Sequence, residues 1–445
     1  MTAALQFSAF TLQPRAMLTK PSTSRSRFSG LWRNADFMKL WVGQTISELG
    51  SRITRDGLPL AAVLVLGATP TQMGVLTALG SVVGLFASLP AGVWVDRLRR
   101  RPIMIAADAG RAALLMLIPI AAFSHQFRIE LLYVVMAVAG ALTVLFDAAY
   151  EAYLPALIER QHLMEGNSKL ALSSSLAEVL GPGLAGFLIQ LLTAPLAIFF
   201  DALSFLASIV SLIFIRKPEP RPAPPEHRRH LAREMMDGLR FVWHEPHLRA
   251  MALSGGTRSF FGNFIGVLYA LFAIRELGLG AAALGLTISM GGLGSLIGAV
   301  LAERTVKRYG IGRALIGTTL AGGGFTLLIP LAGGSINGAM LMLMIAQLCG
   351  DAFSTLAFIT AVSLRQSITP DRLLGRTSTG MQVLIAGVAP IGAMAGGLLA
   401  EAIGVRATLW IAGIGIVLST GWLIVSPIRS LRERPDRATR PEESA

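Results

Sequence analysis

Twelve apolar runs, each long enough to cross a bilayer, recur along this chain of 445 residues. A helix needs about 20 apolar residues to cross the hydrocarbon core, and lipid offers no partner for backbone N–H and C=O groups. The runs are too long for barrel strands, so each one predicts a helix. They cover 40–66, 72–95, 103–123, 130–153, 170–193, 195–215, 249–273, 282–302, 313–333, 338–362, 377–401 and 405–426.

The positions of the basic residues predict the orientation of these helices. If the first helix starts inside, 32 of the 39 lysines and arginines fall in inner segments, and the outer loops hold Arg128, Arg275 and Arg406. Inner loops of membrane proteins are enriched in lysine and arginine. We therefore expect a multi-pass protein of the cell inner (cytoplasmic) membrane with both termini cytoplasmic. The net charge of +13 then faces anionic lipids and needs no nucleic acid partner.

A Pro-rich stretch divides the chain into six helices plus six. The segment 216–248 begins "RKPEPRPAPPEHRRH", and its second part keeps helical spacing of Leu231, Met235, Leu239 and Val242. The expected organisation is a basic tail (1–36), an N-terminal bundle (37–215), a linker with an amphipathic helix (216–248), a C-terminal bundle (249–426) and a second tail (427–445).

The two halves resemble each other in three places, in the same order and at nearly one offset. "LGSR" (49–52) matches "GGTR" (255–258), "VDRLRRR" (95–101) matches "AERTVKR" (302–308), and "LGPGLAG" (180–186) matches "VAPIGAMAGG" (388–397). Two repeated six-helix halves with a site at their interface are typical of secondary transporters. The predicted fold class is an all-α membrane protein with two pseudo-symmetric six-helix bundles.

The segment "GVWVDRLRRRP" (92–102) resembles the signature that follows the second helix in the major facilitator superfamily. The matching residues are Gly92, Asp96, Arg97, Arg100 and Arg101, whereas Arg99 stands where that signature has a glycine. The segments "IAADAGRAALL" (105–115), "FFDALSFLAS" (199–208) and "LRQSITPDRLLGR" (364–376) resemble the branch that contains macrolide, multidrug and enterobactin exporters. The resemblance covers about residues 32–425 and implies the major facilitator fold.

The resemblance implies a conformational latch at this signature. A tight loop in which an acid precedes several bases can hold two helix ends together, and the repeat adds Glu303 and Arg304 as the counterparts of Asp96 and Arg97. Alternatively, the arginines of this loop only fix it on the inner side of the membrane. That interpretation does not explain the presence of Asp96.

A second motif lies on the fifth helix. "LGPGLAG" resembles the proton-antiporter signature at Gly181, Pro182 and Gly186, with Ala185 in place of a glycine. Small residues let helices approach closely, and proline permits a bend. Tight packing alone is the alternative interpretation.

The first helix has charges at its centre, where an unpaired charge is expensive. At about 100° per residue, Glu48, Arg52, Arg55 and Asp56 form one stripe, with opposite signs four residues apart at Glu48–Arg52 and Arg52–Asp56. The stripe must face a wet cavity or the other bundle. The stripe is either a fixed ion-pair network or a site where Glu48 or Asp56 exchanges protons.

Other charged residues at membrane depth extend this candidate site. We assign Glu178, one turn before Pro182, and Arg258, the counterpart of Arg52, to proton coupling and the central cavity. Arg111 is expected to pair with Asp108 or with an acid on another helix. Further acids at this depth are Asp147, Glu151, Asp201 and Asp351.

These features predict a secondary active transporter that exports an amphipathic small molecule (a drug, macrolide or siderophore) in exchange for protons. The alternatives are a lipid or lysophospholipid transporter of the same fold, or a membrane sensor without transport. No Walker A, HExxH or GxSxG sequence occurs, so we expect neither an enzyme nor a cofactor or metal. The expected partners are the small-molecule substrate, protons and membrane lipids, with the chain acting as a monomer.

Overall fold

The structure is a computed structural model that describes residues 30–219 and 231–431. Most of the two predicted tails and residues 220–230 of the predicted linker therefore lie outside the described residues. Within the described part, eleven helical segments are long and apolar enough to cross a membrane. A further helix, α1, has the required length but carries the charged stripe. The predicted twelve-helix architecture is thus consistent with the structure.

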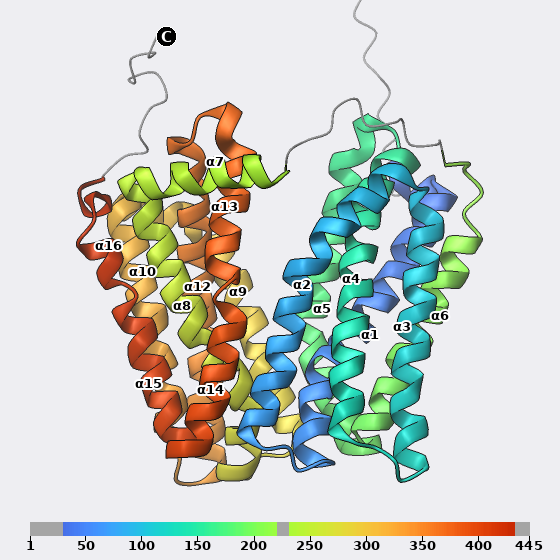
Figure 1. The fold of residues 1–445 in the computed structure, drawn as a ribbon, viewed down its shortest axis with the longest axis horizontal. Helices are drawn as coiled ribbons and strands as arrows, with labels where there is room; N and C mark the ends of the chain where they lie inside the picture. Colours follow the sequence, from blue (N-terminus) through green and yellow to red (C-terminus); the bar gives the residue numbers. More distant parts are fainter. Residues whose placement is uncertain (1–29, 220–230, 432–445) are drawn as a thin grey trace, which may run out of the picture.

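The first six crossing helices form one bundle, the N bundle, drawn in blue to green in Figure 1. They are α1 (Ala35–Leu64), α2 (Pro70–Arg97), α3 (Arg100–Phe123), α4 (Ile129–Leu157), α5 (Leu163–Leu192) and α6 (Ala194–Ile213). A capping box fixes the N-terminus of α2. The Thr69 side chain accepts a hydrogen bond from the Gln72 backbone N–H, and the Gln72 side chain accepts one from the Thr69 backbone N–H.

The remaining helices form the C bundle, drawn in yellow to red. They are α8 (Pro246–Leu271), α9 (Ala281–Tyr309), α10 (Ile311–Thr326) with α11 (Leu328–Leu331), α12 (Ile336–Ile368), α13 (Leu374–Ala386) with α14 (Ala389–Ile403), and α15 (Val405–Leu418) with α16 (Gly421–Ile424). Pro390 stands at the start of α14. Proline lacks the backbone N–H that would continue a helix, which accounts for the break after α13.

The linker ends in the amphipathic helix α7 (Leu231–His244), which lies across one end of the C bundle (Figure 1). We call the end of the molecule that holds α7, Ala35 and Ile213 the linker face, and the other end the loop face. Val242 is buried, whereas Trp243 is half exposed. A Cβ at Gly238 would clash with the Arg376 carbonyl oxygen, so α7 packs directly on α13.

Several helices run further toward the linker face than the apolar runs predict. The helix α9 ends at Tyr309 instead of 302, and α12 ends at Ile368 instead of 362. The added turns of α9 contain Glu303, Lys307 and Arg308. Hydropathy detects only the apolar part of a helix, so polar turns beyond it are missed.

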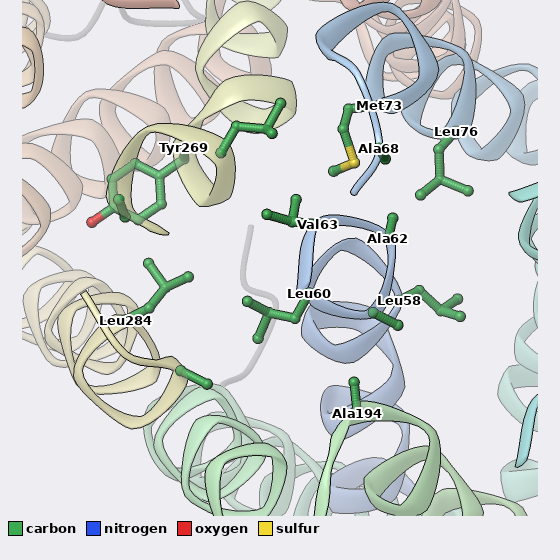
Figure 2. Packing of buried hydrophobic residues seen from close by; sticks show 14 of the residues in the cluster. Leu58, Leu60, Ala62, Val63, Ala68, Met73, Leu76, Ala194, Tyr269 and Leu284 are labelled. Carbon is green, nitrogen blue, oxygen red and sulfur yellow. The ribbon is translucent and has the colours of Figure 1, made fainter. Parts of the chain in front are cut away.

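The buried apolar residues form a shared core at the loop face and separate cores at the linker face. The shared core joins both bundles, with Leu60, Val63 and Met73 from the N bundle beside Tyr269 and Leu284 from the C bundle (Figure 2). The two cores at the linker face draw their residues from one bundle each. Among the described residues, the apolar core that both bundles share thus lies at the loop face.

Glycines make the contact between the bundles close. A Cβ at Gly186 on α5 would clash with the Ala281 carbonyl oxygen of α9, and one at Gly285 would clash with the Pro182 carbonyl oxygen. The α2–α14 contact is similar, because a Cβ at Gly74 would lie 2.8 Å from the Ala393 carbonyl oxygen. Residues without side chains let two backbones approach this closely.

Candidate functional site

The charged stripe on α1 contains one ion pair. The Arg52 Nη2 and Glu48 Oε1 atoms are 3.8 Å apart, and the Ser174 hydroxyl donates to the same Glu48 oxygen at 3.4 Å. The Glu48 side chain is 40% exposed and the Arg52 side chain 16% exposed. The ion pair therefore lies between α1 and α5, and its Glu48 side chain is the more exposed of the two.

The second spacing of opposite charges, Arg52 to Asp56, does not form an ion pair. Asp56 retains only longer-range electrostatic interactions with Arg55 and Arg52. Side chains on a helix lean toward its N-terminus, so Arg52 reaches back to residue 48 and away from residue 56. Arg55 is exposed. The two ends of the stripe therefore differ in how firmly their acids are paired.

The stripe continues on α4, which the sequence reasoning did not assign to the site. Asp147 interacts electrostatically with Arg111 first, and then with Glu48, Glu151 and Arg55. Tyr150 interacts with Glu48 and Asp147. Asp147 and Glu151 are both exposed. A face shared by α1 and α4 thus holds more acids than bases, and only the three-dimensional fold shows that these acids are neighbours.

A second ionic network lies inside the N bundle, and Arg111 connects it electrostatically with Asp147 of this face. Arg111 forms a short contact with Asp108, the nearby partner that the spacing indicates, and Arg111 Nη1 donates to Thr143 at 3.4 Å. The Arg111 guanidinium also lies 4.4 Å from the centre of the Phe146 ring and 4.3 Å from that of Phe205. Desolvated cation–π contacts of this kind are among the stronger ones, so this arginine is fixed on all sides.

Asp201 belongs to the same interior. It is completely buried at the crossing of α1 and α6 and accepts a hydrogen bond from Ser204 at 2.9 Å. A Cβ at Gly50 would lie 2.5 Å from Asp201 Oδ1, so the glycine permits α1 to approach this carboxylate. This position agrees with a helix-packing role.

A third group of charges crosses between the bundles. Arg258 on α8 donates through Nη2 to Ser354 on α12 at 2.5 Å, and Asp351 on α12 interacts electrostatically with Arg258 and with Glu178 of the N bundle. The backbone of Glu178 lies directly against α9, because a Cβ at Gly292 would be 2.8 Å from its carbonyl oxygen. The structure thus connects Glu178 with Arg258 through Asp351.

The residues of the predicted latch are not joined to one another. No described residue forms a hydrogen bond or ion pair with the Asp96 carboxylate, and the space beside Gly92 is open. The backbone N–H groups of Arg100 and Arg101 instead donate to the Glu219 carboxylate at 2.7 and 3.1 Å. Glu219 therefore caps the positive end of α3, a contact that its place in the Pro-rich linker did not reveal.

The matching residues of the C bundle are also exposed. Glu303 forms an ion pair with Lys307, with 2.6 Å between the carboxylate and Nζ, one turn along the same helix. Arg304 lies beside it on α9, and Arg97 is exposed in the N bundle.

The antiporter-like motif lies where the bundles meet. A Cβ at Gly181 would lie 2.6 Å from the Cβ of Arg52, whereas Pro182 and Gly186 contact α9 as described above. The Gly183 N–H also donates to Ser289 Oγ at 2.9 Å across the interface. One turn of α5 therefore contacts both the charged stripe and the opposite bundle.

The C bundle contains a pocket of about 400 Å³ around Arg258. Its polar lining includes Ser254, Asn263, Thr319 and Ser354, and apolar side chains such as Phe358 complete it. A second pocket, of about 390 Å³, lies on the opposite side of α8 beside Trp243, Phe260 and Phe261. Phe264, Tyr269 and Phe272 of the same segment are buried in the packing.

Two repeated six-helix bundles, joined at one face and containing ionisable groups between them, define a membrane transporter. The chain belongs to the Major Facilitator Superfamily, whose family model matches residues 40–382 and, in a second overlapping match, 251–445. Transporters, and not enzymes, make up the relatives that were found.

Three relatives illustrate the branch. The uncharacterized MFS-type transporter YfiS of Bacillus subtilis (strain 168) is 27% identical over 427 residues, which cover 90% of this chain and 97% of YfiS. The enterobactin exporter EntS of Citrobacter koseri is 26% identical, covering 82% of this chain and 88% of its own. Macrolide efflux protein A of Streptococcus pyogenes is 24% identical, covering 54% and 58%.

Solved structures share the fold at low identity. The nucleoside transporter NupG has a TM-score of 0.65 at 10% identity, covering 87% of this chain and 98% of its own. A bacterial homologue of the iron transporter ferroportin, solved in an inward-facing state, has a TM-score of 0.67 at 17% identity, covering 89% and 99%. These similarities confirm the major facilitator fold.

Proposed function

We propose that the protein exports an amphipathic small molecule of the drug, macrolide or siderophore class in exchange for protons, by alternating access. The relatives named as macrolide and enterobactin exporters support the cargo class. The bundles share an apolar core at the loop face and meet along α5 and α9 through glycines, which supports a rocking motion of one bundle against the other.

The observation that carries the proposal is the group formed by Glu178, Asp351 and Arg258. Its two acids belong to different bundles, and Asp351 interacts with Glu178 of the N bundle and with Arg258 of its own bundle. Movement of the bundles changes the distance between these charges, and a neighbouring charge changes how readily a carboxyl group holds a proton. Proton binding and conformation would therefore be linked at this position. Glu48 and Asp56, with the neighbouring Arg52 and Arg55, extend the same link along α1.

The linker face would be cytoplasmic, in the inner membrane. This orientation follows the distribution of lysine and arginine, and it makes the conformation shown open to the cytoplasm. In this state Asp96 would be released from the latch. The latch would form when the linker face closes, and Glu303 with Arg304 would act in the other bundle. The chain would act as a monomer surrounded by lipid.

Proton flux driven by cargo tests this proposal. The protein is reconstituted in vesicles of phosphatidylethanolamine and phosphatidylglycerol with a pH-sensitive dye inside, and erythromycin is added with and without an imposed pH gradient. Wild type should move protons when erythromycin is present, whereas Glu48→Gln, Asp56→Asn and Glu178→Gln should each reduce this flux. If all three variants retain full gradient-driven flux, the coupling assignments are wrong.

The same vesicles separate the alternative function. Lipid or lysophospholipid movement between leaflets need not follow a pH gradient, so a fluorescent lysophospholipid serves as the second probe. Gradient-independent movement of this lipid without any effect of erythromycin would favour the lipid transporter. Absence of transport of both probes would favour a sensor.

A further inference from the structure

The pocket of the C bundle is lined by residues of α8, α10, α12, α13 and α16. The helix α8 packs against α13, α14 and α15, and Arg258 reaches from α8 to Ser354 on α12. The pocket occupies the space beside this bridge. Its volume of about 400 Å³ falls within the range of small-molecule sites, which is about 300–1,000 Å³.

Arg258 is the one charged residue among the described residues that line this pocket. Its Nη2 donates to Ser354, but its Nη1 is shielded from water and has no hydrogen-bond partner among the described residues. A buried donor without a partner is unfavourable, and most so when it is charged. An acceptor that enters the pocket would remove this penalty after a small turn of the guanidinium.

The other walls favour a molecule with an apolar body. Met251, Leu315, Ala357 and Ile385 contribute aliphatic surface, and Phe358 contributes an aromatic ring. The Asn263 amide already donates through Nδ2 to the Ser259 carbonyl oxygen at 2.8 Å. Arg258 is thus the one charged donor in a lining of small polar and larger apolar side chains.

We propose that this pocket binds the apolar body of the cargo and that Arg258 Nη1 donates to an oxygen acceptor on it. The acceptor class includes carboxylate, sulfonate, phenolate and carbonyl oxygens, with anionic oxygens bound more strongly. The inference rests on the proposed transport of an amphipathic molecule, and it adds a site and a charge preference to that proposal. Arg52, the counterpart in the N bundle, is already paired with Glu48.

The test uses a reporter thiol inside the pocket. Cys349 is replaced by alanine, and Ala357→Cys places a thiol on the pocket wall. The rate of its alkylation by N-ethylmaleimide is measured in the purified full-length protein with two probes. Anilinonaphthalene sulfonate has an apolar body with an anionic oxygen acceptor, and N-phenyl-1-naphthylamine has a similar body without it. We expect the sulfonate to slow alkylation at least fivefold, and the amine by twofold or less at equal concentration.

Three further variants assign the protection to the pocket and to Arg258. Arg258→Gln should remove the difference between the two probes. Gly262→Leu should abolish protection by both, because Gly262 lines the pocket and has open space beside it. Gly266→Leu is the matched control on the same helix, since its surroundings are equally open but it lies outside the pocket lining, and it should retain full protection.

Equal protection by both probes that Arg258→Gln leaves unchanged would overturn the role of Arg258. No protection by either probe in folded wild-type protein would overturn the pocket as a binding site. If Arg258→Gln does not elute as a folded monodisperse protein, the comparison of Gly262→Leu with Gly266→Leu decides on the site, and the ratio between the two probes in wild type decides on the acceptor preference. This binding assay needs no pH gradient. It can therefore confirm the binding site when the flux assay refutes proton coupling, and it can refute the site when the flux assay confirms coupling.

Discussion

The interiors of the two bundles differ although their helices repeat. The N bundle buries Asp108, Arg111 and Asp201, and two aromatic rings lie against the arginine. The C bundle places Arg258 beside a pocket of about 400 Å³, with Ser354 as its hydrogen-bond partner. The arginine of the N bundle is thus enclosed by its acid and by aromatic rings, whereas the arginine of the C bundle has open space beside it.

This difference suggests how one repeated scaffold serves two tasks. A packed ionic interior resists rearrangement, because separating its charges leaves one of them buried and unpaired. A pocket with a spare donor can accept a molecule without breaking an ion pair. Under the proposed function, Glu48 and Asp56 of the N bundle would act on protons, whereas Arg258 of the C bundle would both contact the cargo and take part in proton coupling through Asp351.

The largest expected effect comes from breaking the interior of the N bundle. Arg111→Leu leaves Asp108 buried without its partner, which is expected to destabilise the protein by about 3–5 kcal/mol. Thermal unfolding in detergent, followed by tryptophan fluorescence, measures the change. Adding Asp108→Leu should restore most of the lost stability. Unchanged melting of the single variant would contradict the description of the N bundle as the rigid half.

A large effect is also expected at the contact between the bundles. Gly186→Ala introduces a Cβ about where the Ala281 carbonyl oxygen lies, and overpacking of this kind costs about 1–3 kcal/mol. Because the contact exists only while the loop face is closed, erythromycin transport should fall about tenfold and that face should become more accessible to alkylation. Gly324→Ala, with open space beside it, is the control. Full transport by Gly186→Ala would show that both bundles adapt easily.

A matched pair of arginine variants sharpens the division of tasks. Arg52→Gln removes the ion pair to Glu48, so proton flux driven by erythromycin should fall about fivefold, the equivalent of roughly 1 kcal/mol. Binding of the naphthalene sulfonate should remain. Arg258→Gln should weaken both this binding and the proton flux, because Arg258 lines the pocket and interacts with Asp351. Similar losses of both functions in both variants would refute the division.

The smallest effects are expected at the two ends of the linker. Glu219→Gln weakens the cap on α3 in the N bundle and should lower stability by about 0.5–1 kcal/mol. Asp237→Asn removes a half-exposed ion pair to Arg376, at 3.5 Å in the C bundle, and should change stability by less than about 1 kcal/mol. Denaturant unfolding of both variants compares them. A greater loss from Asp237→Asn would reverse the expected order.

The number and type of helices follow from the sequence because each crossing must satisfy its own backbone within about 20 apolar residues. The end of α3 at Phe123, for example, coincides with the end of its apolar run. Breaks within crossings were not predicted, such as the one between α13 and α14. Ion pairs within one helix could also be predicted from the sequence, since Asp108 and Arg111 are three residues apart on the same helix.

Contacts between residues on different helices could not be predicted from the sequence. Glu178 and Asp351 become neighbours through the packing of α5 on α9 and of α9 on α12, which no local pattern encodes. Hydropathy also did not indicate the pocket between α8 and α12, because a pocket depends on how far apart the assembled bundle holds these helices. Gly186 of the antiporter-like motif was identified from the sequence, but its close approach to Ala281 of α9 follows only from the packing of the two bundles.

The two anchors of the linker set a limit on motion. Glu219 fastens the chain to the N bundle, and α7 packs on α13 of the C bundle at Gly238. A fully extended chain spans at most about 3.5 Å per residue, so residues 220–230 can reach roughly 40 Å. The covalent connection therefore sets an upper limit on how far these two ends of the bundles can move apart. Shortening it residue by residue should leave transport intact until its full length no longer covers the distance that the bundles travel.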